Sequence, residues 1–399
     1  MDLANRFEQL DAWLARYQSV WRAKPFVEPL LGWEAQWPEL AEWLRGRTLE
    51  QAERAHTQLH SLQAPAPFAE LLAEAQQLVE LPDWSQLPPT LPEILGRHMP
   101  GRKWQQITRF AAVTRQRWQY QPEHWLDWCA GKGHLGRLLA WQTGQPLTCL
   151  EYQPALNSEG ARLSQHLAVK AEHLDADVLS PAAWTLIAPQ HSVVALHACG
   201  QLHMTLLQQV VGQQCPQLAL SPCCYNRIVG PAYQPLSQHA SRARLQLSKE
   251  DLALPLQETH TAGQRNRRLR DQSMAWRLAF DLWRREATGS DSYLPTPSRP
   301  ESALNQGMPA FCRELASYHG LTLPEPADWQ ELEASGWQRL AQVRNLELVR
   351  GLFRRPLEVW LLLDRALFLQ EVGYSVELGQ FCPVDVSPRN LLLLAERPG

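Results

Sequence analysis

The stretch Asp127-Trp-Cys-Ala-Gly131-Lys-Gly133-His-Leu-Gly136 decides the fold of this chain. It has the pattern of a buried strand, a glycine turn and the first turn of a helix. Glycines leave no side chain between the backbone and a ligand, and a helix N-terminus offers free N–H groups. An acid four residues before the first glycine suits a cationic ligand group better than a pyrophosphate. This combination favours S-adenosylmethionine, whose amino-acid end carries an ammonium and a carboxylate.

The glycine spacing alone is shared with nicotinamide and flavin enzymes, so it leaves a methyltransferase and a dehydrogenase open. Glu151 ends a second apolar run, where an acid binds ribose hydroxyls in either class. Asp177 follows a third strand-like segment and is suited to the adenine amino group, which favours the methyltransferase. The residues expected to bind the donor are Asp127, Ala130, Gly131, Lys132, Gly133, His134, Leu135, Glu151, Tyr152, Asp177, Val178 and His197.

Strand and helix patterns alternate from Tyr120 to about Arg227, which predicts an α/β fold with a doubly wound, mostly parallel Rossmann-like sheet. Residues 374–378 alternate like a strand, and residues 390–395 have the composition of a buried final strand. We therefore expect an antiparallel pair of strands near the end of the sequence to complete the sheet.

The same patterns predict four consecutive segments. Residues 1–95 form an N-terminal helical domain, because their apolar residues recur at helical spacing, and the proline-rich run 81–92 marks its end. Residues 96–239 form the donor-binding half of a methyltransferase core. Residues 240–300 form an insertion on the substrate side, and residues 301–399 supply helices and the final strands.

Composition narrows the class of protein. The chain has 399 residues, 45% of them hydrophobic, which predicts a globular protein of two or three domains. No apolar run reaches the roughly 18–20 residues that span a bilayer. The first ten residues lack the apolar region of a signal peptide, so we expect a cytoplasmic protein without a membrane partner.

The cysteines predict neither disulfides nor a metal site. The chain has eight, without a disulfide-framework spacing and without a Cys-x-x-Cys pair. In a cytoplasmic chain of this size we expect reduced thiols.

Positive charge is concentrated in two segments, although the formal net charge is −3. Segment 97–117 has six Arg or Lys and no acid, and segment 265–270 has four Arg. Such patches bind phosphates, whereas a solvated helix face has the same composition. We predict RNA as the partner, with Arg102 and Lys103 in contact with the substrate. The acidic region 1–95 keeps a protein or small-molecule acceptor open.

Two later strand ends carry reactive side chains, in His197-Ala-Cys-Gly200 and in Ser221-Pro-Cys-Cys-Tyr-Asn226. Ligands of open α/β sheets bind outside the carboxyl ends of the strands, so both segments are expected to border the donor pocket. A histidine there can act as a general base and a cysteine as a nucleophile, whereas buried packing is the alternative for the cysteines. The predicted catalytic residues are His197, Cys199, Cys223, Tyr225 and Asn226.

Neither of two known acceptor chemistries fits these segments closely. Methylation of cytosine C5 needs an Asp-x-Pro-Cys context, which His197–Gly200 lacks. Methylation of exocyclic amines uses an Asp- or Asn-Pro-Pro-aromatic loop, to which Ser221–Asn226 is only loosely similar and which follows a different strand. The acceptor atom therefore stays open.

Five segments in this order resemble a methyltransferase-like group. The group includes the eukaryotic glutathione S-transferase C-terminal-domain-containing protein and the ribosomal-RNA-adenine-dimethylase-domain-containing protein. The likeness covers roughly residues 96–230 and 345–399 and implies methyl transfer from S-adenosylmethionine, without implying an acceptor. The segments are Asp127–Gly136, His197–Gly200, Ser221–Tyr225, Leu363–Glu371 and Ser387–Asn390.

A more distant likeness is to tRNA 2′-O-methyltransferases, which carry zinc-finger cysteines and paired histidines where this chain has Tyr225-Asn226. Arg389, in the loop before the final strand, either contacts substrate or ties down the hairpin. The functional hypotheses are an RNA methyltransferase, a methyltransferase for a protein or small molecule, and a non-catalytic RNA- or protein-binding module on this fold. The sequence does not indicate an oligomeric state.

Overall fold

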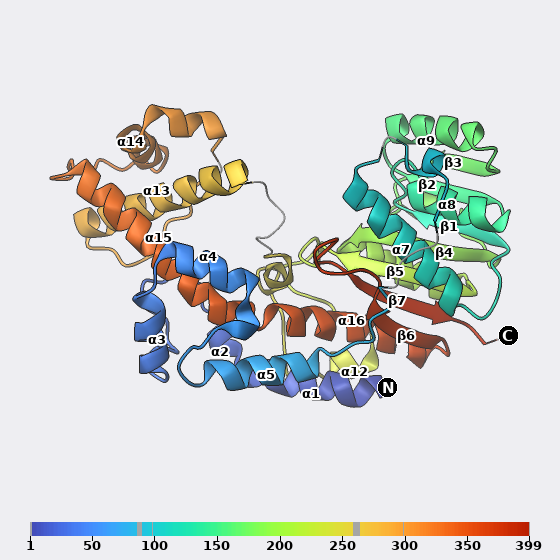
Figure 1. Ribbon diagram of the computed structural model, residues 1–399, viewed down its shortest axis with the longest axis horizontal. Helices are drawn as coiled ribbons and strands as arrows, with labels where there is room; N and C mark the ends of the chain where they lie inside the picture. Colours follow the sequence, from blue (N-terminus) through green and yellow to red (C-terminus); the bar gives the residue numbers. More distant parts are fainter. Residues whose placement is uncertain (1, 86–89, 98, 258–263, 298, 399) are drawn as a thin grey trace. The chain divides into compact units, whose positions relative to one another are not determined.

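The computed structural model describes residues 2–85, 90–97, 99–257, 264–297 and 299–398. Parts of three predicted segments lie outside the described residues: 86–89 in the proline-rich run, 98 in the first basic segment, and 258–263 and 298 in the expected insertion. Within the described residues, seven strands form one sheet in the order β3-β2-β1-β4-β5-β7-β6 (Figure 1).

The first five strands run parallel, and β7 pairs antiparallel with β5 and with β6. The predicted fold class, including the antiparallel pair that completes the sheet, is confirmed. The strands are β1 (His124–Trp128), β2 (Leu147–Glu151), β3 (Ala171–Asp175), β4 (His191–Cys199), β5 (Gln217–Cys223), β6 (Ser375–Gln380) and β7 (Leu391–Glu396).

Helices connect the parallel strands, as a doubly wound sheet requires. Helix α8 packs on β1 and β2, and α9 packs on β2 and β3 (Figure 1). Helix α11 packs on β4 and β5. The helices of this part of the chain are α7 (Gly101–Arg117), α8 (His134–Thr143), α9 (Pro154–His166), α11 (Gln201–Gly212) and α16 (Arg354–Glu371), with short helices α6 (Glu93–Gly96), α10 (Pro181–Trp184), α12 (Gln238–Ser241) and η2 (Asp251–Leu256).

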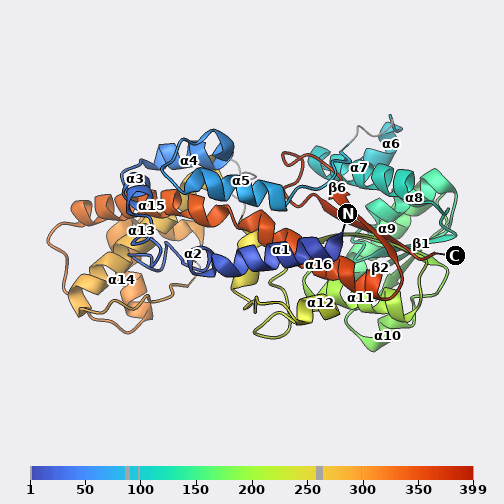
Figure 2. The ribbon, with the colours of Figure 1, turned by 90° about the horizontal axis from the view of Figure 1, so that it is seen from below.

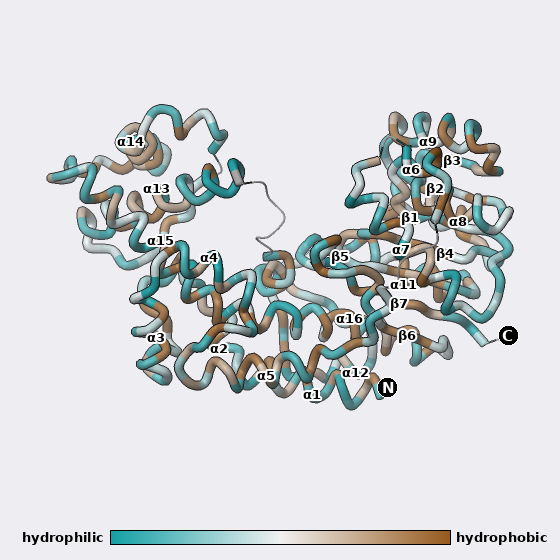
Figure 3. The backbone as a smooth tube through the Cα atoms, viewed as in Figure 1, coloured by the Kyte–Doolittle hydropathy of each residue, from teal (hydrophilic) through white to brown (hydrophobic). Residues whose placement is uncertain are grey.

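One face of the sheet is covered by α7 and α8. Phe110 of α7 and Leu139 of α8 are fully buried in a cluster with Trp125 of β1 and Leu392 of β7. Hydrophobic residues, brown in Figure 3, run through the strands, as in the Leu391–Leu394 run of β7. Because β7 is buried, its side chains contribute to the core although the strand lies far from β1 in sequence.

Helices α1 (Leu3–Arg16) and α16 lie side by side (Figure 2), and the ring centroids of Phe7 in α1 and Trp360 in α16 are 4.9 Å apart. Arg365 of α16 donates to His203 Nε2 of α11 at 2.9 Å, and Trp128 of β1 donates to the Leu202 carbonyl at 3.1 Å. The beginning and the end of the chain are therefore both parts of the unit that contains the sheet.

The chain forms two compact units. The sheet unit comprises residues 1–15, 78–257 and 355–399, and the helical unit comprises residues 16–77 and 258–354. The boundaries of these units differ from those of the four expected segments. The expected N-terminal helices are present, but α1 belongs to the sheet unit. Residues 240–257 of the expected insertion belong to the sheet unit, and the rest of it belongs to the helical unit.

The helical unit is built around α13 (Gln264–Thr288) and α15 (Trp329–Gly351). At Gly336 the helices approach so closely that a Cβ atom would lie 2.5 Å from the Ala275 carbonyl oxygen. Among the described residues, no helix has the length and apolar character to cross a membrane. The other helices are α2 (Gln18–Trp21), α3 (Pro38–Arg45), α4 (Leu49–Thr57), η1 (Leu59–Ser61), α5 (Phe68–Leu78), η3 (Glu301–Gln306) and α14 (Met308–Tyr318).

Candidate functional site

The glycine turn lies between β1 and α8, as the sequence predicts. Gly131 and Gly133 have φ angles of 58° and 65°, in the left-handed region that favours glycine. A Cβ atom on Gly131 would have no heavy atom within 4 Å, whereas one on Gly133 would meet Cys149 Sγ at 2.8 Å. Gly133 thus permits close packing, and Gly131 leaves open space beside the turn.

Two acids fix this turn. Glu151 accepts hydrogen bonds from the backbone N–H of Gly131 at 2.9 Å and of Gln153 at 3.0 Å. Asp127 accepts from the Gly136 N–H at 2.9 Å. Burial raises the pKa of Asp127 to about 7, against the lowering effect of the Gly136 hydrogen bond. The structure thus shows Asp127 supporting the first turn of α8; its contact with the methionine end stays a prediction.

The predicted donor-site residues around the turn are brought together. Ala130 accepts from the Gly133 N–H at 2.9 Å, and Leu135 is buried in the core beneath the turn. The Lys132 ammonium pairs with Glu159 at 2.7 Å. His134 contacts Arg137 at 2.7 Å, and burial lowers its pKa to about 3, so its ring is neutral near pH 7.

The ends of β2 and β3 place the remaining donor-site residues. Tyr152, beside Glu151, is 71% exposed, so its ring is accessible to a ligand. Asp177 is exposed and accepts from the Leu179 N–H at 3.0 Å, while Val178 is buried. Asp177 therefore caps a local turn in this structure, and its contact with adenine stays a prediction.

The carboxyl ends of β1, β4 and β5 share an uncommon backbone conformation. Cys129, His197 and Cys224 have φ angles of 56°, 65° and 46°. Left-handed conformations are unfavourable for residues with a Cβ atom and are concentrated at functional sites. At His197 the deviation coincides with an irregularity in the pairing of β4 with β5. This edge of the sheet is therefore the structure's candidate for the reacting side of the site.

The His197 ring is held by a residue that sequence patterns did not indicate. His197 Nε2 lies 2.8 Å from Gln106 Oε1 of α7, and since that oxygen only accepts, Nε2 carries the proton. His197 Nδ1 is buried and has no hydrogen-bond partner among the described residues. Burial lowers the pKa of His197 to about 4, and the positive charges of Arg389 and Lys103 add to this effect. The ring is thus neutral near pH 7, with an unused lone pair at Nδ1.

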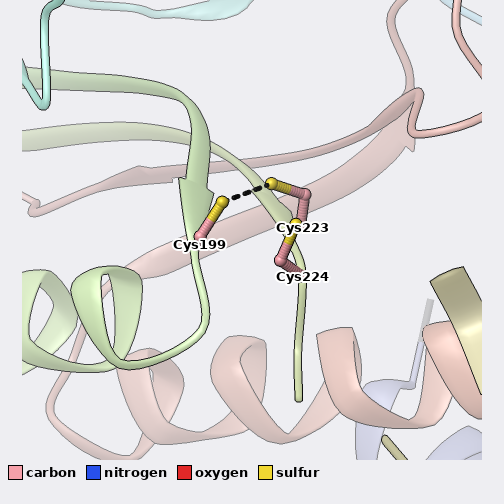
Figure 4. A group of neighbouring side chains, drawn as sticks. All are labelled: Cys199, Cys223 and Cys224. Atoms are coloured by element: carbon pink, nitrogen blue, oxygen red, sulfur yellow. Dashed lines mark hydrogen bonds between the residues drawn. The ribbon is translucent and has the colours of Figure 1, made fainter. Parts of the chain in front are cut away.

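Three thiols meet at the same edge (Figure 4). The sulfur atoms of Cys199, Cys223 and Cys224 lie within 4.8 Å of one another, and Cys199 and Cys223 are 3.3 Å apart. The spacing of the cysteines along the chain predicts no metal site, and spacing is the usual sign of metal-binding cysteines. The sequence feature that indicates the cluster is the position of these cysteines at the ends of two strands. Cys199 ends β4, the Cys223-Cys224 pair lies at the end of β5, and β4 and β5 are neighbours in the sheet.

Tyr225 is placed differently from the prediction. It is 2% exposed, its ring packs edge-on against His203, and the Arg365 guanidinium lies 5.0 Å from the ring centroid. Burial raises its pKa above the ordinary value. Tyr225 thus faces the interior of the sheet unit, because an apolar ring gains more from burial there than at the edge. Asn226 is half-buried beside it.

The predicted substrate-binding cations lie on two elements. Arg102 and Lys103 are exposed in the first turn of α7. Arg389 is half-buried in the loop before β7, where its Nη2 donates weakly to the Leu256 carbonyl at 3.4 Å. Arg389 Nε is buried without a partner among the described residues. The positive charges of Lys103 and Arg389 both lower the pKa of His197, so two of the three predicted cations influence the edge of the sheet that carries His197.

The sheet order, the glycine turn and the acid at the end of β2 define a Rossmann-like methyltransferase fold. The open space at Gly131 and the hydrogen bond that joins Gly131 to Glu151 leave this turn accessible to a bound donor molecule. Residues 102–230 match the model of a family described as a methyltransferase domain. This part of the chain is therefore a methyltransferase domain of the S-adenosylmethionine-dependent class, with S-adenosylmethionine as its cofactor.

Two solved structures align with parts of the chain. YjhP from E. coli has 13% identity and a TM-score of 0.24, over 32% of this chain and 55% of that one. Coclaurine N-methyltransferase bound to N-methylheliamine and S-adenosylhomocysteine (SAH) has 16% identity and a TM-score of 0.28, over 47% of this chain and 62% of that one. The chain thus spans less than two thirds of either structure. The narrower likeness to the glutathione S-transferase C-terminal-domain-containing group stays a prediction.

Proposed function

We propose that this protein transfers a methyl group from S-adenosylmethionine to RNA. The observation that carries the proposal is that the positive charges of Lys103 and Arg389, from two separate elements, both act on His197 and lower its pKa. The two cations come from α7 and from the loop before β7, and the acceptor is expected at the edge of the sheet that carries His197. Every nucleotide of an RNA chain carries a backbone phosphate, and Lys and Arg are the side chains that commonly bind it.

The unused hydrogen-bonding capacity of Arg389 supports an anionic ligand. A buried guanidinium N–H without a partner is costly, and a phosphate oxygen would remove that cost. The exposed Arg102 extends the same positive surface along the first turn of α7. In the helical unit, Arg265, Arg267 and Arg268 are exposed at the beginning of α13. They provide a second basic surface of the kind that binds a nucleic-acid backbone.

The chain's own residues would act mainly by positioning. Bound S-adenosylmethionine supplies an electrophilic methyl group. The turn at Gly131 and the Glu151 carboxylate would hold the donor, with Glu151 toward the ribose. His197 Nδ1 would accept a proton from the acceptor, because Gln106 holds the proton of the ring on Nε2. Lys103 and Arg389 would fix the phosphate next to the acceptor.

The test uses the full chain with tritiated S-adenosylmethionine and extract from cells that lack the gene. We expect label that ribonuclease releases and protease does not. Lys103→Ala and Arg389→Ala should each raise the KM for RNA about tenfold, the loss of one charge-assisted contact, while SAH affinity is unchanged.

Lys170→Ala is the matched control, because Lys170 is exposed just before β3, at the opposite edge of the sheet. Label that only protease releases would replace RNA with a protein acceptor. Label in small molecules would indicate a metabolite, and SAH binding without any transfer would favour a binding module.

A further inference from the structure

The proposed methyl transfer assigns no role to the three thiols of Cys199, Cys223 and Cys224. Figure 4 shows the thiols of Cys199, from the end of β4, and Cys223, from the end of β5, pointing toward one another. Both also lie near the His197 carbonyl oxygen, at 3.5 Å for Cys199 and 3.3 Å for Cys223. The bulge at His197 thus turns a backbone oxygen toward the same point as the thiols.

The backbone holds the two cysteine segments together independently of any ligand. Cys199 and Cys223 are direct partners in the β4–β5 pairing, and the Gly200 N–H donates to the Cys223 carbonyl at 3.0 Å. A Cβ atom on Gly200 would lie 2.2 Å from the Arg227 carbonyl oxygen, so this approach requires glycine. The Arg227 N–H donates in turn to the Cys224 carbonyl at 2.9 Å. The thiols are therefore preorganised.

The cluster also differs from most other cysteines of the described residues in its surroundings. Cys149, Cys215, Cys312 and Cys382 are buried, whereas two members of the cluster, Cys199 and Cys224, are half-buried. The group is therefore accessible from outside the core, as the binding of a metal ion requires.

We propose that Cys199, Cys223 and Cys224 together bind one Zn²⁺ ion. Three thiols each lose a proton to solvent as three Zn–S bonds form, and no electron is transferred. The resulting charge of −1 is offset by Arg227 and Arg389. A Zn–S distance of about 2.3 Å in a tetrahedron places sulfur atoms about 3.8 Å apart, which falls within the 4.8 Å limit of the cluster.

The number of ligands defines the kind of zinc site. Among the described residues the group consists of three cysteines, whereas structural zinc sites have four protein ligands. The fourth position is therefore left to water. Glu151 ends β2 and Cys199 ends β4, and both strands run parallel to β1, so the thiols and the acid expected to bind the donor lie at the same edge of the sheet. The site we propose is an open one, next to the methyl donor.

The test needs neither donor nor acceptor, so it is independent of the proposed function. The reduced full chain, freed of metal by a chelator, is titrated with Zn²⁺ and separately with Co²⁺. We expect one equivalent of each, a thiolate-to-cobalt charge-transfer band, d–d bands typical of four-coordination, and displacement of Co²⁺ by Zn²⁺. Cys199→Ser, Cys223→Ser and Cys224→Ser should each abolish the one-equivalent binding and the band.

Cys215→Ser is the matched control, because this buried thiol, which contacts the Ala188 carbonyl oxygen at 3.7 Å, lies outside the cluster. It should bind one equivalent with an unchanged spectrum. The wild-type titration decides the case even if a cluster variant fails to fold. Binding well below one equivalent, a cobalt spectrum without thiolate bands, or binding of copper(I) alone would overturn the proposal. Wild-type spectra persisting in all three folded cluster variants would overturn it too.

Discussion

The Glu151 carboxylate accepts a hydrogen bond of 2.9 Å from the backbone N–H of Gly131, which joins the end of β2 to the turn after β1. A second bond, from the Gln153 N–H, fixes the other carboxylate oxygen. The acid that is expected to bind ribose is thus preorganised by backbone groups, which reduces the entropy lost when a ligand binds.

We predict that Glu151→Gln weakens SAH binding about 10- to 100-fold, because a hydrogen bond to a charged group contributes about 1.5–3 kcal/mol. The variant keeps the size of the side chain and one acceptor oxygen. Isothermal titration with SAH measures the change. Glu172→Gln, at an exposed position of β3, is the control and should bind SAH normally. Equal affinity of Glu151→Gln and the wild type would remove Glu151 from the donor site.

Gly131→Leu should abolish detectable SAH binding, because a side chain there would occupy the open space beside the turn. The control is Gly144→Leu. Gly144 has a similar φ angle of 73° and is equally open, but it lies at the other end of α8. Both variants carry the same kind of backbone strain, so equal losses of thermal stability are expected. Normal SAH binding by Gly131→Leu would contradict the assignment of the turn to the donor.

His197→Ala should lower kcat on the order of 10²–10⁴-fold, the usual contribution of a general base. SAH affinity should be unchanged, which separates a role toward the acceptor from one toward the donor. Gln106→Leu should lower kcat less and change its dependence on pH, since it frees the ring to exchange its proton between the two nitrogens. If His197→Ala instead loses SAH affinity and keeps its kcat, the ring belongs to the donor site.

The buried histidines predict that acid destabilises the protein. Burial lowers the pKa to about 3 for His134 and to about 4 for His173, His191 and His197. Histidines of the unfolded chain titrate near 6.5, so between about pH 6.5 and 4 the unfolded chain binds more protons than the folded one. The free energy of unfolding therefore decreases as the pH is lowered through this range.

Asp127 acts in the opposite direction, because its raised pKa lets the folded state bind the extra proton between its ordinary value and about 7. Among the described residues, His124 and His203 also have a lowered pKa, which makes six histidines, whereas the pKa is raised for two acids, Asp127 and Glu347. The net effect of acidification is therefore a loss of stability. Denaturant titrations at about pH 7, 6 and 5 measure it. Asp127→Asn, which removes one of the two opposing groups, should make the decline steeper. A free energy of unfolding that stays constant or rises toward pH 5 would contradict this account.

The sequence was sufficient for features that depend on local pattern. The glycine turn, the parallel strands and the closing strand pair follow from hydrophobic periodicity and from the need of Gly131 and Gly133 for left-handed φ angles. Each of these features is encoded within a few neighbouring residues.

The remaining features depend on contacts between distant parts of the chain. The Phe7–Trp360 contact assigns α1 to the sheet unit, and the bond between Gln106 and His197 joins residues 91 positions apart. Tyr225 was expected at the edge of the sheet, but the pattern around it does not show that His203 and Arg365 enclose its ring. The thiol cluster was missed because spacing along the chain does not reveal which strand ends are neighbours.

The sheet order has a consequence for protein synthesis. Strand β7 is hydrogen-bonded on one side to β5 and on the other to β6, yet it is the last of the seven strands to be translated. While residues 391–396 are still inside the ribosome, the edge of β5 has no partner, and unpaired strand edges promote aggregation. The nascent sheet unit therefore benefits from protection, for example by a chaperone, until residues 391–396 have left the ribosome.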